Sequence, residues 1–208
     1  MFDLPEAKLC VMSYAFDAPM EDRPWQVGLI VGPSGSGKSS VAQHLFGDDV
    51  LHGYDWPDDV SVIDAFPAHL SVQQVSDALR AAALYDPAVW LRPYRVLSGG
   101  EQFRVTLARA LLDNRPRVVI DEFTSVVDRV VARAGAQAVA DAVRATPGKQ
   151  FVAVACHDDL LPWLRPDWII EPHAARFAWA APSDVPALHR TSFDALLMRG
   201  KGALTFDH

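Results

Sequence analysis

Residues 32–39, Gly-Pro-Ser-Gly-Ser-Gly-Lys-Ser, constrain most strongly what this chain can fold into. They follow the short apolar run 27–31 and precede a helical pattern over residues 39–46. Glycines at this spacing let backbone N–H groups turn inward around a polyphosphate, and the start of the following helix adds partial positive charge. We therefore predict a nucleotide-binding phosphate loop between a buried strand and a helix.

The residues of the phosphate loop (32–39) have distinct expected roles. Lys38 reaches the terminal phosphates, and the Ser39 hydroxyl can ligate Mg²⁺. The alternative, a glycine-rich turn that binds nothing, is disfavoured because a strand and a helix flank the motif. The predicted nucleotide-binding residues of this segment are Gly32, Pro33, Ser34, Gly35, Ser36, Gly37, Lys38, Ser39 and Ser40.

Short apolar runs alternate with helical patterns along the chain. The runs are bounded by turn or charged residues, as is typical of parallel strands covered on both faces. Expected strands cover residues 27–31, 60–63, 118–120 and 151–155. Expected helices cover residues 39–46, 102–112 and 129–145, with a further helix starting near residues 70–73. The alternation predicts an α/β fold with a mainly parallel central sheet, and residues 168–171 and 176–180 predict a terminal hairpin.

Length and composition exclude several classes of protein. The 208 residues favour one compact domain, and a hydrophobic fraction of 50% is too high for a disordered chain. No apolar run is long enough for a membrane span, and the first residues lack the pattern of a secretory signal. Cys10 and Cys156 cannot form a disulfide scaffold, and Cys156 is expected to be a buried thiol. A cytoplasmic protein is therefore predicted.

The net charge of −7 is unevenly distributed. Residues 1–64 hold eleven acidic side chains against three basic ones, whereas residues 79–117 hold seven arginines against three acids. The overall balance argues against a protein that coats nucleic acid with a broad basic surface. The basic window weakly favours a nucleic-acid partner, but arginines beside phosphate sites are the simpler explanation.

Two acidic residues end the strand predicted over residues 118–120. A carboxylate near a phosphate loop is needed to hold Mg²⁺, and Asp121 at the strand end suits that role. Glu122, the next residue, can orient or deprotonate the attacking water. An acidic strand end alone is often a solvated cap, but the preceding phosphate loop favours the functional interpretation.

Ser98, Gly99 and Gly100 precede the amphipathic helix predicted over residues 102–112. Such a turn leaves free N–H groups at a helix start and makes a second anion site. Alone, it would be interpreted as an ordinary serine cap with flexible glycines. In a chain that already holds a phosphate loop, a second phosphate site is what a nucleotide site shared between two subunits would use.

Residues 97–102, Leu-Ser-Gly-Gly-Glu-Gln, resemble the signature sequence of the ATP-binding-cassette (ABC) ATPases, which are P-loop NTPases. Asp121 and Glu122 lie where that family has its Walker B pair, residues 125–128 resemble its D-loop, and His157 resembles its switch histidine. These matches occur in order over residues 27–157. The resemblance implies an ABC-type nucleotide-binding domain with ATP and Mg²⁺ as cofactors.

The same resemblance implies an ATP-dependent homodimer in which two cassettes clamp two ATP molecules head to tail. Each ATP would lie between the phosphate loop of one chain and the Ser98–Gly100 turn of the other. Asp128 is implied as a further nucleotide-site residue. Glu122 and His157 are implied as the catalytic residues, with His157 sensing the γ-phosphate bound to its own chain.

Four stretches are also similar to cassette ATPases that are fused to GNAT-type acyltransferase domains in bacterial and phage proteins. These stretches are residues 90–93, 101–112, 121–129 and 163–168. This narrower resemblance implies a stand-alone version of such an ATPase, whose partner is an acyltransferase or another effector protein.

The sequence departs from transporter cassettes between the two phosphate sites. Asp64 occupies the end of the strand predicted over residues 60–63, where transporter cassettes usually carry a glutamine that meets Mg²⁺. Either Asp64 is a metal ligand, beside Ser39 and Asp121, or Gln73 takes that role. Only 60 residues separate Lys38 from Ser98, so the helical subdomain, about residues 65–115, is expected to be shortened.

We expect residues 1–180 to form the ATPase domain and residues 181–208 to form a C-terminal tail. Tyr14 and Phe16 are candidates for stacking on adenine, with core packing an equal alternative. The main hypothesis is an ATPase that dimerises on ATP and drives a non-transport process. The alternatives are the nucleotide-binding subunit of a membrane transporter, an ATPase partner of a nucleic-acid-modifying or repair system, and a regulatory module with little turnover.

Overall fold

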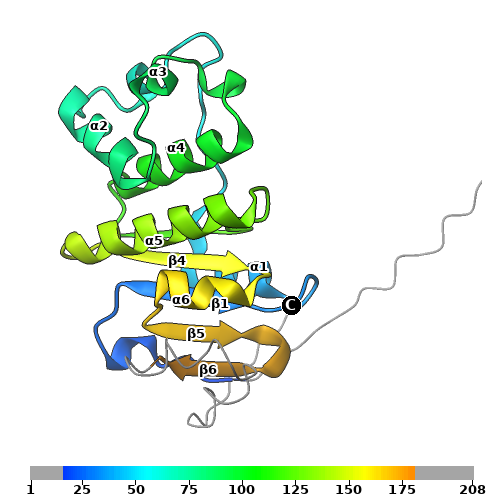
Figure 1. Ribbon diagram of the computed structural model, residues 1–208. Helices are drawn as coiled ribbons and strands as arrows, with labels where there is room; N and C mark the ends of the chain where they lie inside the picture. Colours follow the sequence, from blue (N-terminus) through cyan, green and yellow to red (C-terminus); the bar gives the residue numbers. More distant parts are fainter. Residues whose placement is uncertain (1–15, 181–208) are drawn as a thin grey trace, which may run out of the picture.

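A six-stranded sheet in the order β2-β3-β4-β1-β5-β6 forms the centre of the molecule (Figure 1). The computed structural model describes residues 16–180. The strands are β1 (Val27–Val31), β2 (Val50–Leu51), β3 (Arg117–Ile120), β4 (Gln150–Ala155), β5 (Trp168–Glu171) and β6 (Arg176–Trp179). Neighbours from β2 to β5 run parallel, and β6 forms an antiparallel hairpin with β5. The predicted α/β fold, mainly parallel sheet and terminal hairpin are confirmed.

Several of the helices begin at residues whose side chains cap them. Side chains of Ser71, Ser98 and Asp128 accept backbone N–H groups at the starts of α2, α4 and α5. Each such cap stabilises its helix by about 1 kcal/mol. The α-helices of the described residues are α1 (Lys38–Phe46), α2 (Val72–Ala81), α3 (Pro87–Trp90), α4 (Gly99–Leu111), α5 (Arg129–Ala145) and α6 (Leu161–Leu164). The helices predicted from the sequence are therefore confirmed, with small shifts at their ends.

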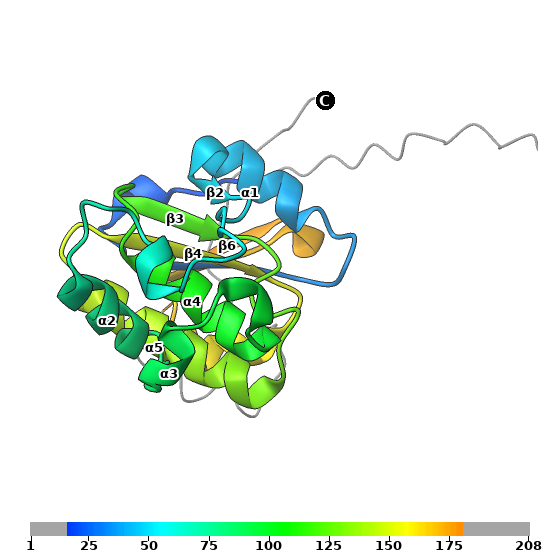
Figure 2. The same cartoon turned by 90° about the horizontal axis from the view of Figure 1, so that it is seen from above.

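Helices cover both faces of the sheet. α1 lies on one face, α5 and α6 lie on the other, and α2, α3 and α4 are stacked beyond α5 (Figures 1 and 2). Two apolar cores result: Phe46 packs with Trp168 under α1, and Leu107 packs with Val139 on the α5 side. All five residues of β1 are buried, because a strand between two covered faces has no side toward water.

The outer helices α2 to α4 lie within the boundaries 65–115 expected for a helical subdomain. Close packing joins this layer to α5: a Cβ on Gly135 would lie 2.4 Å from Cε1 of Phe103 and 3.1 Å from Cδ1 of Leu107. A larger residue at position 135 would therefore push α4 away from α5. The division into an ATPase domain and a subdomain stays a prediction, and the predicted tail 181–208 lies outside the described residues.

The strand predicted over residues 60–63 is wrong. Ser61 forms a single bridge with Pro93, and Ile63–Ala65 form a short 3₁₀ helix, η3. A run of four apolar and polar residues is too short for its pattern to distinguish a strand from a loop packed on neighbouring helices. The strand that pairs with the outer side of β3 is instead β2, which has two residues and gives no periodic signal.

Gly28 in β1 lies directly beside Trp168 in β5. A Cβ at residue 28 would lie 2.1 Å from Cζ2 of the indole ring, and Trp168 is fully buried. Overpacking a dense core costs about 1–3 kcal/mol, occasionally more. We therefore expect Gly28→Ala to lower the free energy of unfolding by about 3 kcal/mol in urea denaturation.

Trp168→Phe supplies the control for this prediction, because the atoms nearest to the new Cβ belong to the six-membered ring of the indole. If the clash is the cause, the double variant Gly28→Ala, Trp168→Phe is less destabilised than the sum of the two single variants. Additive losses would show that the glycine is needed for another reason.

Candidate nucleotide-binding site

The phosphate loop joins the end of β1 to the start of α1 at the carboxyl edge of the sheet. Gly35 and Gly37 have φ angles of 76° and 78°, in the left-handed region that favours glycine. Gly37 immediately precedes α1, so it turns the backbone into the helix, whose first N–H groups have no partner within the helix. The segment thus has the backbone shape and helix terminus that bind phosphate.

Lys38 lies across the loop. Its side chain is buried, with an exposed fraction of 8%, and its Nζ donates to the carbonyl oxygen of Pro33 at 2.8 Å. An ammonium group has three donors, so this bond leaves others that can bind a phosphate oxygen. Ser39 and Ser40 follow on the first turn of α1, and both are exposed. The predicted loop residues are therefore close to one another around the same helix start.

The sheet order brings the other predicted residues to this edge. β4 pairs in parallel with β1 on one side and with β3 on the other, so the residues after these three strands are neighbours. Asp121 and Glu122 follow β3, and His157 follows β4. The N–H of Phe123 donates to the carbonyl oxygen of Val154 at 2.8 Å, which holds the acidic segment against β4. One edge of the sheet therefore carries the phosphate loop, the two acids and the histidine.

Glu122 adopts a strained backbone conformation. Its φ is 52°, and Thr124 two residues later has a φ of 67°, both in the left-handed region. The N–H of Glu122 donates to Oδ1 of Asp121 at 2.8 Å, and the hydroxyl of Ser125 donates to the Glu122 carbonyl oxygen at 2.8 Å. Such residues cost on the order of 1–3 kcal/mol each and cluster at functional sites. The strain supports a functional role for Glu122.

Ser98 caps α4, in the helical layer that α5 separates from the sheet (Figure 1). The N–H of Glu101 donates to the Ser98 hydroxyl at 3.3 Å, and the N–H of Ser98 donates to the Glu101 carboxylate at 2.7 Å. The bond from the Ser98 N–H is the main reason that the pKa of Glu101 is lowered. A hydroxyl that accepts a bond keeps its own proton for another acceptor, such as a phosphate oxygen.

The turn before α5 borders this second site. A Cβ at Gly99 would lie 3.8 Å from the carbonyl oxygen of Val126. Asp128 caps α5 by accepting the N–H groups of two following residues at 2.9 and 3.0 Å. The next residue, Arg129, donates from Nε to the carboxylate of Asp159 at 2.8 Å, in the segment that follows His157. The Asp128 turn therefore lies beside the Ser98 turn and is joined to the His157 segment through Arg129.

Ser39 and Asp121 fit a magnesium ion. Both supply oxygen ligands, and they stand at the first turn of α1 and at the end of β3, on the same sheet edge. Within residues 16–180, no group of three or more His, Cys, Asp or Glu side chains could hold a metal ion. Mg²⁺ is usually bound by one or two protein oxygens together with phosphates and water, so two oxygen ligands are sufficient.

The structure removes the reason for choosing Asp64 as a metal ligand. Asp64 lies in η3 and does not end a strand, and its carboxylate accepts a hydrogen bond from the Ser61 hydroxyl. The alternative, Gln73, lies in the first turn of α2 and donates to Asp77 on the same helix. A metal-binding role for either residue stays a prediction.

The structure decides between the two alternatives for Phe16, and it shows that the expected burial of Cys156 is wrong. Phe16 has an exposed fraction of 2% and belongs to the core under α1, so core packing and not adenine stacking explains it. Cys156 is exposed, because β4 ends at Ala155 and the chain leaves the core there. Tyr14, the other adenine candidate, lies outside the described residues.

Two histidines reach the same sheet edge without a sequence signal that identifies them. His52 follows β2, which pairs with β3, the strand that leads to Asp121. His173 lies in η6 (Pro172–Ala174), the turn between β5 and β6, and β5 pairs with β1. A single histidine after a short strand or in a turn belongs to no motif, so only the sheet order could have revealed either residue.

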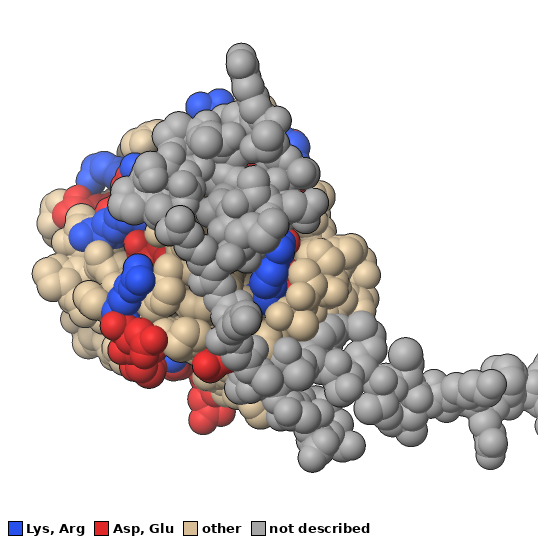
Figure 3. All heavy atoms as spheres, turned by 90° about the horizontal axis from the view of Figure 1, so that it is seen from below, with Lys and Arg blue, Asp and Glu red and all other residues tan. Residues whose placement is uncertain are grey.

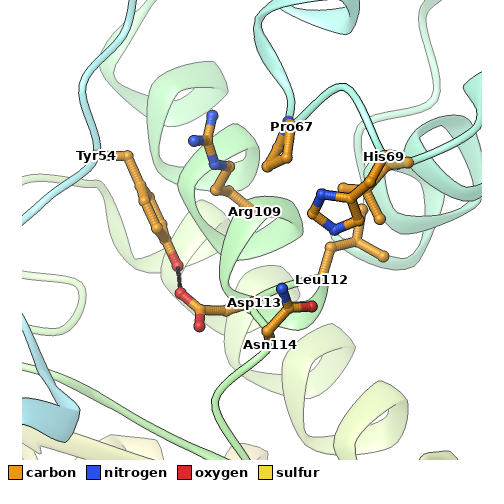
Figure 4. Close-up of a pocket in the computed structure, with 8 residues that line it drawn as sticks. Tyr54, Pro67, His69, Arg109, Leu112, Asp113 and Asn114 are labelled. Atoms are coloured by element: carbon orange, nitrogen blue, oxygen red, sulfur yellow. Dashed lines mark hydrogen bonds between the residues drawn. The ribbon is translucent and has the colours of Figure 1, made fainter.

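A cavity of about 180 Å³ lies between the end of α4 and the segment that follows β2 (Figure 4). The Tyr54 hydroxyl donates to Oδ2 of Asp113 at 3.0 Å. Burial raises the pKa of Tyr54. Hydrogen bonds from Arg115 hold the pKa of Asp113 well below its usual range. The guanidinium of Arg109 lies 5.0 Å from the centres of the Tyr54 and Trp56 rings. These contacts attach the segment after β2 to α4, and no phosphate-loop residue lines the cavity.

On the face drawn in Figure 3, the Lys and Arg side chains, in blue, are intermixed with the Asp and Glu side chains, in red. Within the part of the chain that the structure describes, no helix is long and apolar enough to cross a membrane.

Comparison with known proteins gives related sequences over part of the chain. No protein-family model matches. The chain is similar to the zinc import ATP-binding protein ZnuC of Paracoccus denitrificans, with 37% identity over 127 residues, which are 51% of this chain and 50% of the relative. It is also similar to ABC transporter B family member 28 of Arabidopsis thaliana, with 30% identity over 148 residues, 51% of this chain and 21% of the relative. The chain thus spans about half the length of the first relative and about a fifth of the second.

Solved structures share the fold at low sequence identity. The dimeric structure of MJ0796, a bacterial ABC transporter cassette, has a TM-score of 0.53 and 18% identity, covering 72% of this chain and 82% of that one. The ADP conformation of MJ1267, an ATP-binding cassette of an ABC transporter, has a TM-score of 0.58 and 16% identity, covering 82% and 87%. These matches confirm the fold class predicted from the sequence.

Proposed function

We propose that this chain, which belongs to the ATP-binding-cassette superfamily of ATPases, binds and hydrolyses Mg-ATP at an interface between two copies of itself. The observation that carries the proposal is the sheet order, which gathers the phosphate loop, Asp121, Glu122 and His157 at one edge. Residues that bind phosphate, hold a metal and activate water are needed together for hydrolysis of a phosphoanhydride.

Each residue has a role that follows from its position. Lys38 donates to the terminal phosphates and offsets their charge. Glu122 orients a water molecule and takes its proton as the water oxygen attacks the γ-phosphorus and ADP leaves. His157 contacts the γ-phosphate from the end of β4. Ser39 and Asp121 would hold Mg²⁺, which neutralises charge on the β- and γ-phosphates when it is bound.

The location of Ser98 supports a site shared between two chains. Ser98 starts α4, and α5 lies between α4 and the sheet that carries the phosphate loop. A second copy related by a two-fold axis would bring its own Ser98 and helix terminus to the γ-phosphate, and each chain would complete the site of the other. Asp128 and Gly99, which border Ser98, would face the same interface.

The relatives favour a transporter as the output of the ATP cycle. ZnuC and MJ1267 are described as ATP-binding components of import or transport systems. They support the alternative, a nucleotide-binding subunit that works with a membrane permease, better than the non-transport process predicted first. They give no support to an acyltransferase or a nucleic acid as the partner. Copurification of the native chain with a multispanning membrane protein is the expected result, and copurification with a soluble acyltransferase alone would contradict it.

Mixing two inactive variants tests the shared site. Lys38→Ala removes the ammonium of the phosphate loop, and Ser98→Phe blocks the second phosphate site. A heterodimer of the two holds one complete site, made by the phosphate loop of the Ser98→Phe chain and Ser98 of the Lys38→Ala chain. Equal mixing should restore a measurable part, at most about half, of the wild-type rate of phosphate release, because a heterodimer holds one complete site out of two and neither homodimer holds any.

The matched control mixes Lys38→Ala with the double variant Lys38→Ala, Ser98→Phe. No pairing of these chains creates a complete site, so phosphate release should stay at the level of each variant alone. Recovery in this control, or none in the first mixture, would contradict a site built from two chains.

A further inference from the structure

The turn between β5 and β6 lies beside the phosphate loop (Figures 1 and 2). β5 pairs in parallel with β1, so both strands end at the same edge, β1 leading into the loop and β5 into η6. Two features fix this turn. Glu171 is buried, and its carboxylate accepts a hydrogen bond from Nη2 of Arg176 at 3.0 Å. Ala175 has a φ of 47°, which reverses the chain direction.

His173, in this turn, contacts the first residue of the phosphate loop. A Cβ at Gly32 would lie 2.8 Å from Nδ1 and 3.5 Å from Cε1 of the imidazole, so the ring fills the space that a side chain at residue 32 would need. Gly32 also has a φ of 158°, a backbone conformation that residues with a side chain rarely adopt. The contact with His173 and the Ser36 hydroxyl, 3.0 Å from the same Cβ position, therefore add to the backbone conformation in requiring a glycine here.

We propose that His173 is a positioning residue of the nucleotide site, whose ring packs on Gly32 and holds the start of the phosphate loop in the shape that binds phosphate. The inference rests on the proposed function. The N–H of Gly32 reaches the Ala155 carbonyl oxygen only at 3.4 Å, so this backbone bond is a weak anchor for the start of the loop. His173 itself is exposed, so its ring contributes little to the core. A displaced loop start would move the N–H groups that surround the phosphates.

Calorimetric titration of the full-length chain with Mg-ADP tests the role of the ring. His173→Ala is expected to weaken ADP binding roughly tenfold, because misplaced binding groups lose affinity steeply. His173→Phe keeps a flat ring against Gly32 and should bind ADP with nearly wild-type affinity. His69→Ala is the matched control, because His69 is another exposed histidine but lies beside the cavity at the end of α4; its affinity should equal that of the wild type.

A double variant tests the contact itself. Gly32→Ala should weaken ADP binding, since the new methyl group meets the imidazole. Removing the ring in Gly32→Ala, His173→Ala makes room for that methyl group, so the loss of ADP affinity in the double variant should be smaller than the product of the losses in the two single variants. Losses that simply multiply would overturn the proposed contact, because the two positions would then act independently.

Three other results would overturn the positioning role. The first is wild-type ADP affinity in His173→Ala. The second is that His173→Phe binds ADP as weakly as His173→Ala, because a contact made by a ring nitrogen, and not packing of the ring, would then hold the loop. The third is a loss of ADP affinity that is matched by a lower thermal midpoint of unfolding in the absence of nucleotide, because general destabilisation would then explain the loss. If the wild type binds no nucleotide, the proposed function itself fails and this inference falls with it.

Discussion

Lys38→Ala is expected to weaken nucleotide binding by about 10- to 100-fold, because a hydrogen bond to a charged group contributes about 1.5–3 kcal/mol. Hydrolysis should fall below detection, since the same ammonium stabilises the charge that develops on the transferred phosphoryl group. Lys38 lies within the phosphate loop, with Nζ 2.8 Å from the Pro33 carbonyl oxygen, and needs little movement to meet a phosphate. Titration with Mg-ADP and measurement of phosphate release check the two parts separately.

Lys149 provides a matched control for this variant. It is also a buried lysine, and its Nζ donates to the carbonyl oxygens of Asp113 and Arg115 at 2.6 and 2.9 Å, at the opposite end of β3 from Asp121. Lys149→Ala should lower the free energy of unfolding but leave ADP affinity unchanged. Equal losses of affinity in both variants would mean that removing any buried lysine disturbs the fold. Wild-type affinity in Lys38→Ala would contradict the assignment of the phosphate loop.

Glu122→Gln is expected to slow ATP hydrolysis by about 10²- to 10⁴-fold, the usual contribution of a positioned general base. Nucleotide affinity should be retained, because an amide replaces the carboxylate without a change in size. An ATP-bound dimer should then accumulate, since the step that opens it is blocked. Light scattering with Mg-ATP should report twice the monomer mass for this variant.

Two controls separate this outcome from nonspecific association. Glu21→Gln changes an exposed carboxylate in the short helix η1 (Met20–Asp22) and should hydrolyse ATP at the wild-type rate. Glu122→Gln combined with Lys38→Ala should remain monomeric with Mg-ATP, because the dimer requires bound nucleotide. A monomeric Glu122→Gln single variant in saturating Mg-ATP would reject the head-to-tail arrangement.

The sequence could predict those parts of the molecule that depend on local signals. The phosphate loop, the strand before it and the helix after it are adjacent in the chain, and the structure has all three at the expected residues. Helix α5 begins and ends at the predicted residues because Asp128 caps one end and Pro147 and Gly148 follow the other. Local caps and turns decide such boundaries.

The remaining parts depend on contacts between distant segments. The apolar run 60–63 places Asp64 at a strand end, but these residues form no strand, and β2, which pairs with β3, has only two residues and gives no sequence signal. Phe16 could equally stack on a base or pack in a core until its burial beside the sheet was known. The contact between His173 and Gly32 joins residues more than a hundred positions apart, and no spacing rule relates them.

The close contact at Gly135 has a mechanical consequence for the proposed dimer. Because the side chains of Phe103 and Leu107 occupy the space above Gly135, α4 and α5 are closely packed, and we expect them to move together if the proposed dimer closes. Ser98 and Asp128 are the capping residues at the starts of these two helices. A displacement of Ser98 by a partner's nucleotide would then reach Asp128 and, through the hydrogen bond from Arg129 to Asp159, the segment beside His157.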